Sequence, residues 1–144
     1  MPEDVTNAGL DPAPAERFVR LRAQLGVSSF GLNQIALAPG QRSRIHRHIH
    51  QEEVYLVLDG TLTLEFEDGP REYTHGELVR VAPHVRRRLV NRHRTPLSLL
   101  ALGGSLEHEH QGRDAEAFAD WADSDPHAPQ DMPLPEDLPA SDLT

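Results

Sequence analysis

The sequence predicts an all-β protein. Apolar and polar side chains alternate over short segments, as they do along a strand that buries one of its faces. Turn residues separate these segments at close spacing, among them Asp59-Gly60 and Asp68-Gly69-Pro70. Because the segments follow one another without a convincing long helix between them, we expect antiparallel strands that close or stack around one core.

The expected strands cover residues 17–21, 28–37, 53–58, 61–66, 71–73, 78–81, 87–91 and 97–102, and a strand carries His46 and His48. For residues 21–25 the alternative is a single helical turn closed by Gly26, since glycine readily adopts the positive φ of a helix C-terminus.

The chain has a one-domain length of 144 residues, and its central 17–106 region suits a small barrel. It contains no cysteine, which excludes disulfides and thiolate ligands. No apolar run is long enough to span a membrane, and the acidic N-terminus is unlike a signal peptide. We therefore expect a cytoplasmic protein with no membrane partner.

Charge divides the chain into three parts. The formal net charge of −9 combines an Arg-rich 17–106 region with two acidic flanks, and the chain has no lysine. The run Arg86-Arg87-Arg88 is divided between two faces of a strand, and the chain is acidic with few aromatic residues. We therefore expect no nucleic-acid partner.

The two flanks read as accessory segments. Residues 1–16, rich in proline, are expected to form a flexible leader. Residues 107–144 are expected to form an acidic, Pro-rich tail with a short helix over 115–122, whose Phe118 and Trp121 pack on the outside of the barrel. Residues 123–144 bury little apolar surface, so we expect them to be disordered and dispensable.

Three side chains point to a metal site. His46 and His48 are two residues apart on a strand and so share a face, and Glu53 opens the next apolar segment. Two imidazoles and a carboxylate on one face suit a divalent first-row metal.

The spacing around these residues resembles the first motif of the cupin family. Gly40, His46, His48, Glu53 and Gly60 satisfy every interval of that motif. The central region is similar to small single-domain bacterial cupins, and this resemblance implies a cupin-type antiparallel β-barrel, a double-stranded β-helix of the jelly-roll kind. It also implies a metal on His46, His48 and Glu53, with Zn, Fe, Mn or Ni as the candidates, and a homodimer.

The second cupin motif is half kept. Gly76 and Asn91 fit its ends, but Arg87 stands where the fourth, histidine ligand is expected, and His84 stands where a glycine is expected. Arg87 shares a face with Leu89 and so projects inward, where an unpaired guanidinium would be very costly.

Two alternatives stay open at this point. In one, Arg87 pairs with Glu53 and replaces the metal. In the other, the metal is retained and Arg87 orients an anionic ligand, with Tyr55 and His84 as further ligand contacts.

The function that these features favour is binding of a small, anionic organic molecule inside the barrel, with a divalent metal where one is retained. If the protein is an enzyme, metal-assisted oxygenation, isomerisation or hydrolysis is expected. The alternative is a metal-free binding or structural cupin closed by the Arg87–Glu53 pair.

Overall fold

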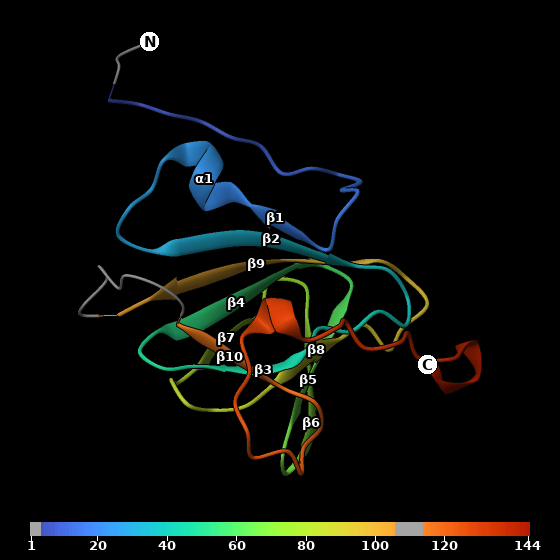
Figure 1. The fold of residues 1–144 in the computed structure, drawn as a ribbon. Coiled ribbons are helices and arrows are strands. Elements are labelled where there is room, and N and C mark those ends of the chain that lie inside the picture. Colours follow the sequence, from blue (N-terminus) through green and yellow to red (C-terminus); the bar gives the residue numbers. More distant parts are fainter. Residues whose placement is uncertain (1–3, 106–113) are drawn as a thin grey trace.

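A computed structural model describes residues 4–105 and 114–144 of the chain, and strands dominate these ranges (Figure 1). The strands are β1 (Phe18–Arg20), β2 (Gly31–Leu37), β3 (Ile45–His48), β4 (Glu52–Asp59), β5 (Thr61–Phe66), β6 (Gly69–Thr74), β7 (Leu78–Val81), β8 (Arg88–Val90), β9 (Leu97–Gly104) and β10 (Ala115–Phe118). One helical turn, α1 (Leu21–Leu25), and two short 3₁₀ turns, η1 (Pro129–Asp131) and η2 (Ala140–Asp142), complete the elements. The predicted all-β class is confirmed, and no helix within the described ranges has the length and apolar character needed to cross a membrane.

The strands form two layers in which every pairing is antiparallel. One layer is a five-stranded sheet in the order β1-β2-β9-β4-β7. The other combines the pair β10-β3 with the sheet β6-β5-β8. Isolated bridges from Arg42 to Val90 and from His46 to Arg87 join the segment around β3 to the segment around β8.

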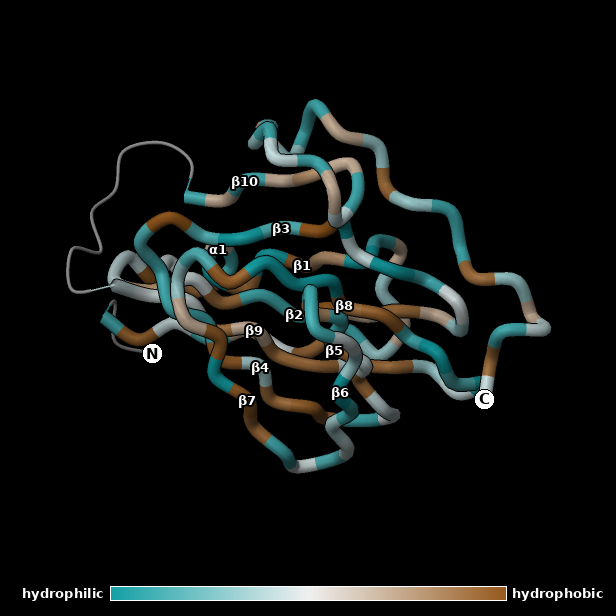
Figure 2. Tube along the Cα trace, turned by 90° about the horizontal axis from the view of Figure 1, so that it is seen from below, coloured by the Kyte–Doolittle hydropathy of each residue, from teal (hydrophilic) through white to brown (hydrophobic). Residues whose placement is uncertain are grey.

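The hydrophobic core lies between the two layers. Figure 2 shows apolar stretches along β4, β5, β8 and β9 in the middle of the molecule, with polar residues in the connections. The buried cluster draws Leu62, Leu64 and Leu89 from one layer and Val57 and Leu99 from the other. These side chains exclude water from the interior, so a polar group placed there needs a partner.

Two motif glycines occupy positions that a side chain would disturb. Gly60 has a φ of 83°, and a Cβ there would clash with the Pro96 carbonyl oxygen. Gly40 has a φ of 86°, and its N–H donates to the Asn91 carbonyl at 2.8 Å. Asn91 is buried, and its side-chain amide donates to the Leu37 carbonyl at 2.9 Å. These two hydrogen bonds connect the start of the first motif, at Gly40, with the end of the second motif, at Asn91.

The prediction of a helix over residues 115–122 is wrong. Residues Ala115–Phe118 form β10, which pairs with β3 in the register Ala115 to His48 and Phe118 to Ile45. Pairing with the open edge of β3 outweighs the weak helix preference of this short segment. Phe118 is buried under the guanidinium groups of Arg47 and Arg86, rather than on the face of a helix.

The prediction of a disordered tail over residues 123–144 is also wrong, because this segment follows a defined path along the barrel (Figures 1 and 2). The Leu138 N–H donates to the Gly40 carbonyl, and the Thr144 N–H donates to the Arg92 carbonyl, each at 2.8 Å. Backbone hydrogen bonds of this kind hold an apolar-poor segment without needing a core of its own.

The leader is likewise held in place. Asp11 exchanges two hydrogen bonds with the side chain of Gln34, at 2.9 and 2.7 Å. Residues 1–3 of the predicted leader and residues 106–113 around the start of the predicted tail lie outside the described residues.

The tail contact makes Gly40→Ala more costly than its φ alone requires. A Cβ at Gly40 would lie 2.8 Å from the Leu138 carbonyl oxygen, whereas at Gly76, with a φ of 82°, it would meet nothing within 4 Å. Gly76→Ala should lower the free energy of unfolding by about 1–2 kcal/mol through φ strain alone. Gly40→Ala should lower it by about 1–3 kcal/mol more, because the added Cβ overpacks against the tail. Urea denaturation measures both, and deleting residues 136–144 should abolish the difference. An equal cost of the two variants in the full chain would contradict the packed tail.

Candidate metal centre

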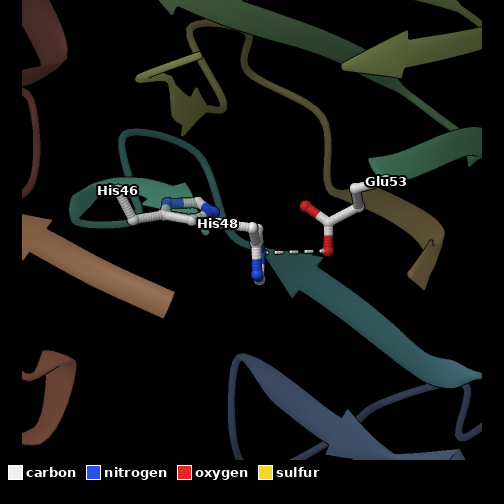
Figure 3. A group of neighbouring side chains, drawn as sticks. All are labelled: His46, His48 and Glu53. Atoms are coloured by element: carbon white, nitrogen blue, oxygen red, sulfur yellow. Dashed lines mark ion pairs between the residues drawn. The ribbon is translucent and has the colours of Figure 1, made fainter. Parts of the chain in front are cut away.

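Three potential metal ligands converge in the interior (Figure 3). His46 and His48 extend from β3, and Glu53 extends from β4 of the opposite layer. One ligand atom from each of the three lies within 4.8 Å of the others. His48 Nε2 lies 3.6 Å from Glu53 Oε2, the contact drawn as a dashed line in Figure 3. The structure therefore brings together the three residues that the first motif predicted.

The second nitrogen of each imidazole is anchored. His46 Nδ1 lies 3.0 Å from the Arg44 carbonyl oxygen, and His48 Nδ1 lies 3.2 Å from Asp114 Oδ2. Both partners are acceptors only, so each Nδ1 carries a hydrogen, and in the neutral imidazole the lone pair is on Nε2. Anchoring of Nδ1 by a carbonyl or carboxylate is the usual way in which proteins orient metal-binding histidines.

The protonation states of two of these groups also suit a metal. Burial, and then the charge of Arg87, lower the pKa of His46 to about 4, so its imidazole is neutral near neutral pH. Burial raises the pKa of Glu53, but the neighbouring His48 and then the charge of Arg87 outweigh it and hold that pKa well below its ordinary value. A neutral imidazole and an ionised carboxylate are the forms in which these side chains bind metals.

Arg87 occupies the place that the fourth ligand of the family would take. It exchanges two backbone hydrogen bonds of 2.9 Å with His46, so the two residues lie directly opposite each other. Its side chain is 0% exposed, and its Nη2 donates to Glu53 Oε1 at 2.8 Å. Nη1 donates to the Val85 carbonyl at 2.8 Å and Nε to the Tyr55 hydroxyl at 3.2 Å. Burial opposes the charge of Arg87, but Tyr55 and Glu53 raise its pKa above the ordinary value, so the guanidinium stays charged.

Tyr55 links the charged pair to the interior. Its hydroxyl donates to Glu53 Oε1, the same oxygen that Arg87 binds. Burial and the neighbouring Glu53 raise the pKa of Tyr55 well above its ordinary value, so the phenol stays protonated and able to donate. Glu53 therefore has one oxygen held by Tyr55 and Arg87, while the other faces His48.

A cavity of about 250 Å³ opens beside this cluster. It is lined by Phe18, Asn33, Ile35, Ser43, Arg44, His46, His48, Glu53, Tyr55, Leu89, Ala101, Ala115 and Pro129. Tyr55, a predicted ligand contact, lines this cavity, whereas the fully enclosed Arg87, also a predicted ligand contact, does not.

Arg44 supplies a cation to the cavity wall. Its Nε donates to the Met132 carbonyl at 2.6 Å, and among the described residues its terminal Nη groups make no protein hydrogen bond. Sequence reasoning missed this residue, because the partner that positions it lies 88 residues further along the chain.

His84 does not join the cluster. Its side chain is exposed and lines a separate surface hollow with Phe66 and Arg71. Its φ of 70° is the left-handed conformation that favours the glycine expected there by the second motif.

Comparison with known proteins agrees with this architecture. The sequence profile of the cupin domain matches residues 33–103. A sugar phosphate isomerase of the cupin superfamily from Silicibacter pomeroyi is 25% identical, with a TM-score of 0.61 and coverage of 88% of this chain and 82% of that chain. A comparison with curated proteins found no match.

Two other solved structures are similar. A protein from Acidithiobacillus ferrooxidans, described as a candidate sugar phosphate isomerase, is 27% identical with a TM-score of 0.56. That match covers 62% of this chain, which spans 59% of the length of the other. A cupin protein from Bacteroides fragilis has a TM-score of 0.62 at 18% identity, over 78% of this chain and 92% of that chain, and supports the fold alone.

The low pKa of His46 should make the metal-free protein sensitive to acid. Between pH 6.5 and 4.5 the unfolded chain protonates this imidazole while the folded chain does not, so the free energy of unfolding falls as the pH falls. The acid sensitivity due to Glu53 begins only below pH 4.5. In chelator, His46→Gln should reduce the slope of unfolding free energy against pH by up to about 1.4 kcal/mol per unit. The exposed His75→Gln is the control, and equal slopes for His46→Gln and the wild type would refute the effect.

Proposed function

We propose that this chain, whose residues 33–103 match the cupin domain, is a metal-dependent cupin that binds a small organic anion in the cavity between its two layers. The observation that carries the proposal is the arrangement of donors. Nε2 of His46 and of His48 keep their lone pairs, and Oε2 of Glu53 faces them from the opposite layer.

The donor set fits a divalent ion. The 3.6 Å between His48 Nε2 and Glu53 Oε2 is close to the roughly 3.4 Å between two ligand atoms of a tetrahedral zinc site. His46, His48 and Glu53 would hold the ion, and Zn, Fe, Mn and Ni all accept such nitrogen and oxygen donors. When bound, the ion would act as a Lewis acid on an oxygen of the ligand.

The charge of the site favours an anionic ligand. Glu53 and Arg87 neutralise each other, so the charges that face the cavity are the bound cation and Arg44. The Nη groups of Arg44, which bind no other described residue, suit a carboxylate or a phosphate. The volume of about 250 Å³ is below the roughly 300–1,000 Å³ of drug-sized sites, so we propose a ligand of a few carbons.

The reaction that we propose to test first is isomerisation of a sugar phosphate. One similar structure, at 25% identity, carries that description, and another, at 27% identity, is described as a candidate for it. In this assignment Arg44 binds the phosphate, and His46, His48 and Glu53 hold the ion beside the sugar oxygens. The apolar walls, such as Ile35 and Leu89, exclude water from the reacting carbons.

The second candidate is a metal-free cupin. The observation that favours it is the 2.8 Å contact between Arg87 and Glu53, in which the guanidinium already neutralises the carboxylate. In that case the site binds its ligand through Arg44 and the imidazoles alone. A homodimer, a cytoplasmic location and the absence of a nucleic-acid partner stay predictions from the sequence.

Arg44→Gln tests the anion site. Loss of a charged hydrogen bond of about 1.5–3 kcal/mol should weaken binding of a sugar phosphate by tenfold or more. Calorimetric titration of the metal-loaded protein measures this, with the unphosphorylated sugar as the control compound. The matched variant is Arg80→Gln, since Arg80 is exposed on β7 and does not line the cavity. Equal affinities of wild type and Arg44→Gln for the sugar phosphate would contradict the assignment.

Arg87→Ala distinguishes the two candidates. When a chelator is present, this substitution leaves the Glu53 carboxylate charged and without its guanidinium partner. The free energy of unfolding should then fall by about 3–5 kcal/mol. With saturating zinc the loss should be small if the ion takes over the carboxylate charge. Urea denaturation under both conditions measures the difference. An equally large loss in zinc and in chelator would support the metal-free cupin instead.

A further inference from the structure

Asp114 links the candidate metal centre to the segment that follows the cupin domain. It lies directly before β10, outside the matched residues 33–103, and its side chain is 7% exposed. Its Oδ1 lies 2.9 Å from the His50 backbone nitrogen and 3.0 Å from His50 Nδ1. Its Oδ2 lies 3.1 Å from the Gln51 backbone nitrogen and 3.2 Å from His48 Nδ1. One buried carboxylate thus faces three nitrogens of the turn between β3 and β4 and one nitrogen of His48, the last residue of β3.

The contact with His48 has a chemical consequence that the turn contacts lack. An ionised carboxylate only accepts hydrogen bonds, so it requires the hydrogen of His48 on Nδ1. The backbone N–H groups of His50 and Gln51 donate to the same carboxylate, and such hydrogen bonds favour its ionised form. In the neutral imidazole, the lone pair of His48 is then on Nε2, on the side of Glu53.

We propose that Asp114 is a positioning residue, which holds His48 in the Nδ1–H tautomer and turns Nε2 toward the metal position. The role in metal binding rests on the proposed function, whereas the role in setting the tautomer does not. Under this proposal, the region after the cupin domain contributes a residue to the candidate metal centre. β10 supports this arrangement, because Ala115 pairs with His48 and also lines the cavity.

Asp114→Asn is the variant that tests the proposal. An amide accepts hydrogen bonds on one side only, so at least one pair of the donors around residue 114 must lose its acceptor. The matched control is Glu116→Gln, because Glu116 lies on β10, two residues after Asp114, and binds Arg47 at 3.0 Å. This control removes a carboxylate that bridges β10 and β3 without touching His48.

Two measurements are needed, and the first requires no metal. Nitrogen-15 NMR of the metal-free wild type should show His48 with its hydrogen on Nδ1, and Asp114→Asn should shift His48 toward the Nε2–H form. Calorimetric titration with zinc should then show an affinity about 10- to 100-fold lower for Asp114→Asn. Glu116→Gln should change neither result.

The outcomes separate this proposal from the proposed function. A wild type that binds no zinc but shows the Asp114-dependent tautomer would overturn the metal centre and support the positioning role. An Nε2–H tautomer in the wild type would overturn the positioning role even if Asp114→Asn fails to fold. Equal losses of zinc affinity in Asp114→Asn and Glu116→Gln, without a change of tautomer, would show that Asp114 only holds the turn.

Discussion

The contact between Arg87 and Glu53 constrains the whole interior. A guanidinium that is 0% exposed is tolerated only because each of its three nitrogens has an acceptor, supplied by Glu53, Tyr55 and the Val85 carbonyl. These acceptors come from both layers of the fold, so the pair fixes how β4 faces the segment before β8. The same contact commits one oxygen of Glu53 and leaves the other for His48. The Glu53 carboxylate therefore determines both how the two layers pack at this point and which oxygen is left for the candidate metal centre.

Strand β3 carries the two imidazoles between two different supports. On one side His46 pairs with Arg87 across the bridge to β8, and on the other His48 pairs with Ala115 of β10. The anchors of the rings differ in the same way, because a local carbonyl holds His46 and a distant carboxylate holds His48. A substitution on the Arg87 side of β3 therefore affects His46 first, and a substitution on the β10 side affects His48 first.

Much of the fold and the three potential ligands were predictable from local pattern. Strand alternation placed His46 and His48 on one face and turned Arg87 inward. The cupin resemblance made Glu53 the partner of Arg87 in one of two alternatives, and the structure contains that ion pair. Such predictions succeed because side chains alternate between the two faces of a strand. The face that a residue occupies therefore follows from the local sequence alone.

What the sequence did not reveal depends on contacts between distant residues. Asp114 reaches His48 across 66 residues, and Arg44 is placed by a carbonyl 88 residues away. β10 was mistaken for a helix because four residues carry little intrinsic preference, and the edge of β3 that they complete is visible only in three dimensions. The acidic tail looked disordered for the same reason, since backbone hydrogen bonds to Gly40 and Arg92 leave no trace in composition.

Arginine at position 87, where the second cupin motif has histidine, would change what the site selects if an ion is bound. A cupin with three histidines and one glutamate surrounds its ion with a single charged side chain, the carboxylate. Here the carboxylate is already shared with a guanidinium, so with a divalent ion bound the cluster carries one positive charge more. Arg44 adds another on the cavity wall. Because charge is screened weakly in a buried site, this excess would favour a doubly charged group such as phosphate over a single carboxylate. If an ion is bound, the residue that departs most from the cupin motif would also make that ion depend on its ligand, since an anion would allow a cation and Arg87 to coexist.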